Sequence, residues 1–436
     1  MKPLWSRSVV PVIVLLASLP LVAASAAFAV PPTYELYPAP SPLGQEAGEP
    51  SLGVNWNTGN AMFIAGLETL RVSFDDSVTP AAASWSDVTF PLTGIITLDP
   101  ILSTDSQTGR TFVAQLAGPA SLMAFTDDDG ASWLPSTSGL LSGVDHQTVG
   151  GGPLTPPLPG VGYAHGVYYC SQGIALAGCA LSLDGGLTFN PPVPIYTLLQ
   201  CGGLHGHVKV APDGTAYVPN KGCGSQQAAV VSANNGLTWT VRKVPGSTSG
   251  NSDPSVGIAS DGTVYFGLVG ADGHAKVAVS HNKGASWSAL QDVGASFGIQ
   301  NAAFPAVVAG DPNRAAFAFL GTPAGGTGTS SDPSFAGVWH LYIATTTNGG
   351  ASWTTVDVTP SDPVQRGSVC LDGTTCGSSR NLLDFMDATV DAQGRVLVGF
   401  ADGCVGPCVS GPPNSDTAVG VIARQSSGPR LFAAFD

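Results

Sequence analysis

The stretch Thr126-Asp127-Asp128-Asp129-Gly130-Ala131-Ser132-Trp133 recurs along this chain and decides its fold. It begins with Ser or Thr, has Asp or Asn two residues later and Gly two residues after that, and ends on an aromatic residue. The same pattern returns at 182–189, 232–239, 280–287 and 346–353. Because a pattern that recurs along a sequence marks a repeated supersecondary unit, the chain is built from repeats.

The pattern is typical of a tight turn between two strands. The Asp or Asn side chain accepts hydrogen bonds from backbone N–H groups of the turn, Gly takes a positive φ, and the aromatic ring covers the turn. We therefore assign Asp128, Asp184 and the Trp residues a structural role. The one alternative is a calcium site where the carboxylates of Asp127, Asp128 and Asp129 adjoin.

These residues resemble the Asp-box, or BNR repeat, of the sialidase superfamily and related β-propellers. The resemblance covers nearly all of the chain after residue 29. It implies a propeller architecture, and it is much less specific for an activity, because one fold hosts many functions.

A second recurring element precedes each turn. Residues 253–266 have the pattern of a strand, an Asp-Gly turn and a second strand. Counterparts begin near Glu49, Asp99, Asp145, His205, Phe304 and Phe385, which makes seven units.

Each unit continues with a third strand, the turn and a fourth strand. The turn is stretched between Ser73 and Trp85 in the first unit and reduced to Gly428 and Leu431 in the last. The sequence thus predicts an all-β, seven-bladed propeller of four-stranded antiparallel blades. The resemblance implies six blades, so six blades with one terminal unit in another role is the alternative.

Composition and the first residues bound the remaining possibilities. The chain has 436 residues, of which 11% are charged and only 16 are Lys or Arg, which argues against nucleic-acid binding. Lys2 and Arg7, the apolar run 9–22 and the small residues Ala27 and Ala29 predict a signal peptide over 1–29. No later run is long and apolar enough to span a membrane. We expect one propeller domain, 30–436, that is secreted or held at the cell wall and acts as a monomer.

The eight cysteines fall into pairs that are close in the sequence. In an exported protein they predict four disulfides, although eight cysteines allow 105 connectivities. The expected pairs are Cys170 with Cys179, Cys201 with Cys223, Cys370 with Cys376, and Cys404 with Cys408.

In propellers of this family the first residues of the innermost strands line a central funnel where ligands bind. Aligned on the Asp-Gly turns, Glu49, Asp99, Asp145, His205 and Asp253 fall at this head position. His146, His207 and Asp387 lie next to it. Repulsion within such an acidic ring raises carboxyl pKa values, which suits a general acid or a divalent metal site. The alternative is that Asp before Pro only starts a strand.

The stretch 201–207 is the most unusual local sequence. His205 and His207 are two residues apart, so on a strand both side chains reach one face and could meet one metal or one substrate. We include His146 as a binding candidate and Cys201 as a rigid anchor of the loop. A cofactor, if there is one, would be a divalent metal, either calcium or a transition metal.

The catalytic residues that the resemblance implies for a sialidase have no clear counterparts in this sequence. Family enzymes use three Arg to hold a carboxylate, a Tyr nucleophile with Glu, and an Asp acid/base, yet no Arg falls at a strand head and no Glu follows Glu68. The best remaining arginines are Arg366, which we expect to be structural, and Arg380, which either binds ligand or pairs with Asp384. For a two-carboxylate glycosidase the catalytic candidates are Asp99, Asp145, Asp253 and Asp387.

Two functions therefore stay open. One is a glycan-directed, glycoside hydrolase-like enzyme acting at the funnel. The other is a non-catalytic propeller that binds a cell-wall glycan or a partner protein. Without the signal peptide the net charge is about -16, which disfavours anionic glycans. A nucleotide-dependent enzyme has no support, because no Gly-rich phosphate loop lies between a strand and a helix.

Overall fold

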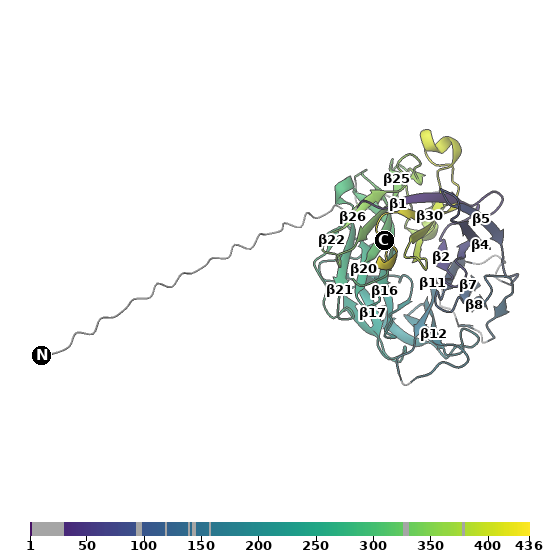
Figure 1. The fold of residues 1–436 in the computed structure, drawn as a ribbon, viewed down its shortest axis with the longest axis vertical. Helices are drawn as coiled ribbons and strands as arrows, with labels where there is room; N and C mark the ends of the chain where they lie inside the picture. Colours follow the sequence, from purple (N-terminus) through teal and green to yellow (C-terminus); the bar gives the residue numbers. More distant parts are fainter. Residues whose placement is uncertain are drawn as a thin grey trace.

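The chain forms a ring of antiparallel sheets around a central axis in its computed structural model (Figure 1). The structure describes Met1 and residues 30–436, except 93–97, 118–119, 138–139, 142–144, 157, 326–330 and 377–379. Seven sheets make up the described part, so the prediction of seven blades is confirmed and six is wrong. The predicted signal peptide, apart from Met1, lies at residues 2–29, outside the described residues.

Each blade has four main strands, and its first strand lies innermost. Blade one comprises β2 (Ser51–Val54), β3 (Ala61–Ala65), β4 (Glu68–Asp75) and β5 (Ala82–Asp87). Blade two comprises β6 (Leu98–Thr104), β7 (Thr111–Ala117), β8 (Ala120–Thr126) and β10 (Leu140–Leu141), with β9 (Leu134–Pro135) also paired to β8. Blade three comprises β11 (Asp145–Pro153), β12 (His165–Gln172), β13 (Leu176–Ser182) and β14 (Val193–Thr197).

The remaining blades repeat this order. Blade four comprises β15 (Lys209–Val210), β16 (Ala216–Cys223), β17 (Gln226–Ser232) and β18 (Thr240–Lys243), and blade five comprises β19 (Ser255–Ile258), β20 (Val264–Val269), β21 (Ala275–Ser280) and β22 (Gln291–Asp292). Blade six comprises β23 (Asn301–Ala309), β24 (Ala315–Thr322), β25 (Val338–Thr346) and β26 (Thr354–Asp357), with β27 (Gln365–Arg366) paired to β25. Blade seven contains β28 (Asp387–Val390), β29 (Val396–Asp402) and β30 (Val419–Ser427).

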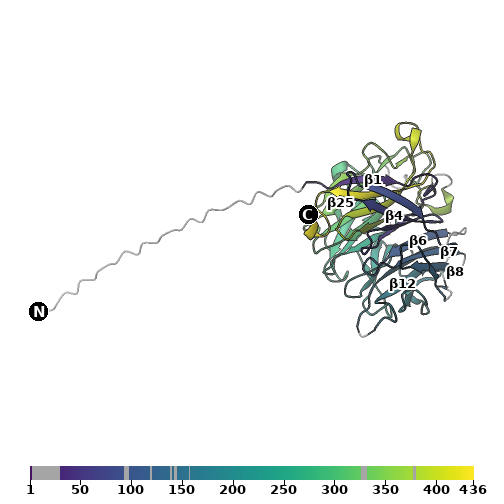
Figure 2. The ribbon, with the colours of Figure 1, turned by 45° about the vertical axis from the view of Figure 1, so that its right-hand side comes forward.

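The outer strand of blade seven comes from the other end of the chain. Strand β1 (Thr33–Pro38) pairs antiparallel with β30, from Thr33 opposite Ser427 to Pro38 opposite Val421. Figure 2 shows β1 lying beside the last strands of the chain. The prediction of a reduced turn and a fourth strand after Gly428 is therefore wrong. The fourth strand precedes the first repeat, so both ends of the chain contribute to blade seven and their pairing closes the ring.

The recurring turns have the hydrogen bonds that the pattern predicts. In the turn between β8 and β9, Gly130 N–H donates to Thr126 Oγ1 at 2.9 Å and Ser132 N–H donates to Asp128 Oδ1 at 2.8 Å. The same two bonds, at 2.8 to 3.0 Å, occur in the other four turns. Gly130 has a φ of 85°, which requires glycine in practice.

The three adjoining carboxylates of this turn do not converge on one point. Asp127 forms an ion pair with Arg110 at 2.7 Å, while Asp129 accepts hydrogen bonds from Asn55 and Asn60 of blade one. In the described part of the chain no three His, Cys, Asp or Glu side chains are placed to hold a metal ion. The geometry therefore gives no support to the calcium alternative.

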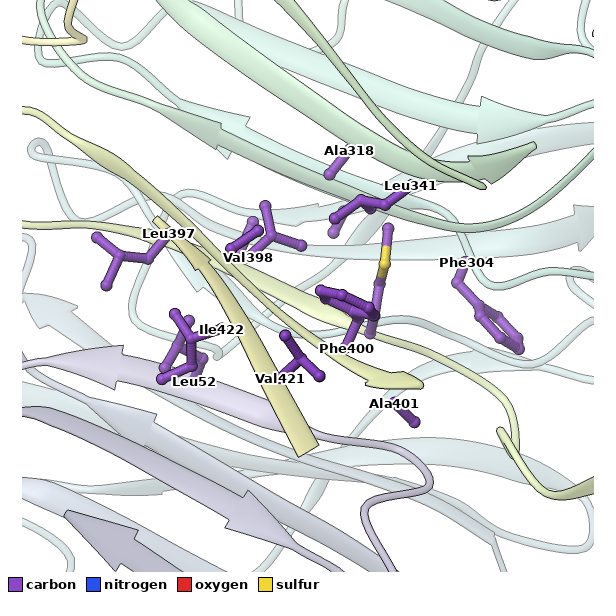
Figure 3. Packing of buried hydrophobic residues seen from close by; sticks show 14 of the residues in the cluster. Leu52, Phe304, Ala318, Leu341, Leu397, Val398, Phe400, Ala401, Val421 and Ile422 are labelled. Atoms are coloured by element: carbon purple, nitrogen blue, oxygen red, sulfur yellow. The ribbon is translucent and has the colours of Figure 1, made fainter. Parts of the chain in front are cut away.

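The hydrophobic core lies between the blades. Separate clusters of buried side chains join blades one and two, two and three, three and four, four and five, and five and six. The largest cluster joins blades six, seven and one. In Figure 3, Phe400 and Ile422 of blade seven lie between Leu341 of blade six and Leu52 of blade one. Because burial of such side chains is the main stabilising contribution, these contacts fix the blades relative to one another and to the funnel.

All four predicted disulfides form, with the predicted local pairing. Two of them hold loops at the funnel side of blades three and four, Cys170–Cys179 and Cys201–Cys223. Four disulfides fit an extracellular protein. Within the described residues, none of the helices has the length and apolar character needed to cross a bilayer.

Candidate functional site

Hydrogen bonds between neighbouring blades identify the head of each inner strand. Thr148 Oγ1 accepts the N–H of Val208 at 3.0 Å, and Ser255 Oγ accepts that of Val307 at 3.0 Å. Asp387 Oδ2 accepts the N–H of Leu52 at 3.3 Å. These contacts place one equivalent residue at the head of each inner strand.

The head residues differ in type from blade to blade, and several of them have an unusual backbone conformation. Four of them, none of which is glycine, have a positive φ between 48° and 56°: Glu49, Asp99, His146 and Phe304. Such a conformation costs about 1 to 3 kcal/mol and persists only where the surroundings enforce it. The prediction of Asp145 at the head is wrong by one residue, because His146 occupies it. In blade order the heads are Glu49, Asp99, His146, His205, Asp253, Phe304 and Phe385.

A cavity of ≈ 1000 Å³ opens above this ring. In blades one and seven the loop between the second and third strands lines it, and these loops lie at the opposite end of the blades from the recurring turns. A segment between blades six and seven, 371–384, contributes part of the wall in its described residues. Its polar lining includes Glu46, Glu49, Asp99, Asp145, His146, Lys221, Asp372, Arg380, Asp384 and Asp416.

Asp99 and Asp145 form a hydrogen-bonded carboxyl pair in the wall of this cavity. Burial raises the pKa of Asp99 to about 6, and the neighbouring Asp145 carboxylate adds to the rise. Burial opposes ionisation of Asp145 too, but His146 and the hydrogen bond from Asp99 lower the pKa of Asp145 to about 2. One carboxyl therefore holds a proton at mildly acidic pH while its neighbour is ionised.

Glu49 is a second acid in the same wall. Its residue is 3% exposed, and burial followed by the nearby charges of Asp99 and Asp384 raises the pKa of Glu49 well above its usual range. Protonated Glu49 can donate a hydrogen bond or a proton into the cavity. The expectation of raised carboxyl pKa values thus applies to Glu49 and Asp99.

His146 lies between carboxylates as a buried cation. Its Nε2 is 2.7 Å from Asp253 Oδ2 and its Nδ1 is 3.2 Å from Asp145 Oδ1. Burial disfavours the charge, but Asp253 and Asp145 raise the pKa of His146 well above its usual range. Lys221 Nζ lies 3.0 Å from Asp253 Oδ1, and burial is again outweighed, so the pKa of Asp253 is well below its usual range. Asp253 therefore pairs with two cations, and Asp145 shares one of them, His146.

Asp387 sits on the inner side of the ring. Besides the Leu52 N–H it accepts the N–H of Ala388 at 2.9 Å, and His207 and Lys209 each lie 3.8 Å away. Burial opposes its charge, but Lys209 and His207 lower the pKa of Asp387. The bond to Leu52 links blade seven to blade one, and a catalytic role for Asp387 stays a prediction.

His205 and His207 both line a narrow cavity of ≈ 10 Å³ beneath the funnel. His205 Nδ1 bonds to Gly206 O at 3.0 Å, and its Nε2 has no hydrogen-bond partner among the described residues. Burial lowers the pKa of His205 to about 4. The ring of His207 packs edge-on against Phe385, with centroids 4.6 Å apart. The two histidines meet one space, as predicted from their spacing, and a metal role for them stays a prediction.

Arg380 and Arg366 have different surroundings. Arg380 forms a two-pronged ion pair with Asp384, at 2.5 and 2.6 Å, and this bond raises the pKa of Arg380. Arg380 therefore pairs with Asp384, and because it also lines the cavity, ligand binding by Arg380 stays a prediction. Arg366 donates to Val409 O at 2.8 Å and does not line the cavity, which agrees with a structural role.

Five charged residues of the lining were not among the predicted site residues: Glu46, Lys221, Asp372, Asp384 and Asp416. Lys221 comes from the loop side of β16, two residues before Cys223, and Asp384 had been considered only as a partner of Arg380. The disulfide Cys201–Cys223 was the signal that could have drawn attention to Lys221, because it ties the loop of His205 to the loop of Lys221.

Comparison with known proteins extends the description of the fold. No family model matches the chain, and no curated protein matches it. Similar solved structures include a protein of unknown function from Dyadobacter fermentans, 15% identical, TM-score 0.45, covering 90% of this chain and 98% of that one. Others are the leech intramolecular trans-sialidase complexed with 2,7-anhydro-Neu5Ac, 10% identical, TM-score 0.42, covering 90% and 70%, and a mutant Trypanosoma rangeli sialidase displaying trans-sialidase activity, 13% identical, TM-score 0.39, covering 74% and 53%. Sialidase propellers are thus among the similar structures, but at these identities and TM-scores they carry no information about activity.

Proposed function

We propose that this chain is an exported Asp-box propeller that binds a neutral glycan in the central cavity and hydrolyses a glycosidic bond there. The proposal is supported by the cavity wall, which brings Asp99 and Asp145 together, with the pKa of Asp99 raised to about 6 by burial and the pKa of Asp145 lowered to about 2 by His146 and Asp99. Pairs of groups whose pKa values are driven apart are typical of acid–base catalysis. The hydrogen-bonded turns and the four disulfides support the Asp-box and export parts of the proposal.

In this proposal Asp99 is the general acid that protonates the leaving oxygen. Asp145 is in hydrogen-bond contact with Asp99, whereas the two carboxyl groups of a glycosidase lie about 5 to 10 Å apart. Asp145 therefore tunes Asp99, and the second carboxylate must come from another part of the wall. Asp384 is our candidate, since it reaches the cavity from the segment between blades six and seven and Arg380 holds its position.

The charges of the cavity favour a neutral ligand over an anionic one. Each cation among the described lining residues already holds a carboxylate of the chain: Lys221 and His146 pair with Asp253, and Arg380 pairs with Asp384. No free guanidinium remains there to hold the carboxylate of a sialic acid. The same observation favours our second candidate function, a glycan-binding propeller without turnover.

A screen of fluorogenic neutral glycosides and one sialoside tests both functions. We expect hydrolysis of a neutral glycoside, and a loss of at least about 100-fold in kcat for Asp99→Asn, the range of general acid catalysis. Asp128→Asn, which changes a carboxylate of the opposite face, is the matched control and should keep full activity. Binding of a neutral oligosaccharide without any product over hours would favour the binding module instead. Full activity of Asp99→Asn would refute the assignment of the acid.

A further inference from the structure

A second hollow adjoins the central cavity on the same face of the molecule. It has a volume of ≈ 440 Å³ and lies over blade four, between the loop that carries Leu198 and Leu199 and the strand end at 221–224. Lys221 lines both this hollow and the central cavity. Both volumes fall in the range of small-ligand sites, about 300 to 1,000 Å³. We call the second hollow the outer groove.

Glycine backbone makes up half of the described lining residues of the outer groove, and Gln200, Lys221 and Ser249 are its polar side chains. Five glycines line it, namely Gly202, Gly203, Gly222, Gly224 and Gly250. At Gly203 a side chain is excluded, because a Cβ would come within 2.5 Å of Gly222 N. At Gly202 there is room, since the only nearby atom would be Leu198 O at 3.8 Å. The groove is therefore open to solvent above Gly202.

The wall of the groove continues into an exposed apolar patch. Leu199 is fully exposed at 101% and Leu198 is 43% exposed, while Ile174 is 81% exposed on the adjoining loop of blade three. The two loops touch, because Leu198 N–H donates to Ala175 O at 3.2 Å. Exposed aliphatic side chains gathered in this way commonly mark a binding surface.

Disulfides hold both loops of this patch. Cys170–Cys179 ties the strands on either side of Ile174, and Cys201–Cys223 ties the Leu198 loop to the strand of Lys221. A rigid apolar surface loses little conformational freedom when a ligand covers it. The patch and the groove are thus organised before a ligand arrives.

We infer that the outer groove is an aglycone subsite, which takes an apolar group attached to the sugar in the central cavity. The inference rests on the proposed function, because the sugar must occupy the cavity for its aglycone to reach across Lys221. An alkyl or acyl chain would bury against Leu198 and Leu199, the two apolar side chains among the described lining residues. The substrate class is therefore a glycoside with an apolar aglycone.

A series of n-alkyl glycosides tests the inference, using the sugar that the fluorogenic screen identifies and methyl, butyl, hexyl and octyl chains below their micelle concentrations. Full burial of one methylene is worth about a fourfold gain, which sets the upper limit. We expect kcat/KM to rise at least 30-fold from methyl to octyl. Gly202→Phe and Leu199→Gln should reduce that gain to less than threefold and leave the methyl glycoside unaffected.

Two matched controls change similar residues elsewhere. Leu237→Gln alters an exposed leucine of a recurring turn, and Gly325→Phe adds a ring where nothing lies within 4 Å. Both should keep the full gain. Equal kcat/KM for methyl and octyl glycosides, or an unchanged gain in Gly202→Phe, would overturn the subsite while leaving the central site intact. A gain with oligosaccharide length in place of alkyl length would overturn it as well. If no glycoside is bound or hydrolysed, the proposed function fails and the inference fails with it.

Discussion

The two ends of the blades follow opposite rules. At the turn end, five blades carry the same pair of hydrogen bonds at nearly the same distances. At the funnel end the equivalent residues are a Glu, two Asp, two His and two Phe. The backbone repeats only in part at the funnel end, where four of the seven heads share a left-handed conformation.

The difference separates architecture from chemistry. The residue type at a turn position is determined by hydrogen bonds within that turn, so the same side chains recur wherever the same turn forms. A head residue faces the other heads across the axis, so its ionisation depends on blades far away in the sequence. Sequence positions that repeat from blade to blade therefore identify the scaffold, and equivalent positions whose residue types differ identify the candidate site in the funnel.

The largest effect should come from removing the buried cation of the funnel. His146→Ala leaves Asp253, whose side chain is 6% exposed, with Lys221 as its remaining partner. Breaking a buried ion pair on one side typically costs 3 to 5 kcal/mol, and we expect about that loss in the free energy of unfolding, measured in urea. His281→Ala is the turn-end control, because His281 bonds only to Thr263 Oγ1 among the described contacts and should cost less than about 1 kcal/mol. Equal losses in the two variants would contradict the contrast between the ends.

A smaller effect should appear as a pH dependence. The pKa of Asp99 is raised to about 6 in the folded protein, so the fold binds this proton more tightly than the unfolded chain does. Its contribution to stability is therefore full below about pH 4 and is lost as the pH rises to about 6. Asp99→Asn does not titrate, so its stability relative to the native chain should improve between pH 4 and pH 7, by at most about 3 kcal/mol.

The control for this pH effect has a shift of opposite sign. Hydrogen bonds from Ser132 lower the pKa of Asp128, so Asp128→Asn should show a constant difference from the native chain above pH 4. Thermal unfolding at several pH values measures both. A pH-independent difference for Asp99→Asn would show that its carboxyl is not held protonated by the fold.

Most of the scaffold could be predicted because its signals are local. Each turn is specified within eight residues, and each disulfide joins cysteines at most 22 residues apart. The closing strand was not predictable in this way. Thr33 pairs with Ser427 near the other end of the chain, and the local sequence around Thr33 does not indicate which strand it pairs with.

The funnel was predictable as a set and not in its details. Aligning the units indicated the right ring, but the alignment placed Asp145 where the hydrogen bonds between blades place His146. Lys221 enters the site from the end of β16 and Asp384 from the segment between blades six and seven, and these two elements come together only in the closed ring. Ion pairing across the axis also decides which of the carboxyls are protonated, and that depends on distances that no single repeat contains.

The smallest effects concern two neighbouring carboxylates of one turn. Asp128 accepts hydrogen bonds from Thr126 Oγ1 at 2.8 Å, Ser132 N–H at 2.8 Å and Ser132 Oγ at 2.6 Å, so Asp128→Ala should cost about 1 kcal/mol. Asp127 pairs with Arg110, but its side chain is 59% exposed, and Asp127→Ala should cost less than about 0.5 kcal/mol. Thermal unfolding ranks the two, and neither variant should change glycoside turnover. A larger loss of stability for Asp127→Ala would mean that the turn depends more on the ion pair with Arg110 than on its own hydrogen bonds. Loss of glycoside turnover in either variant would show that the turn end of the blade affects catalysis in the funnel.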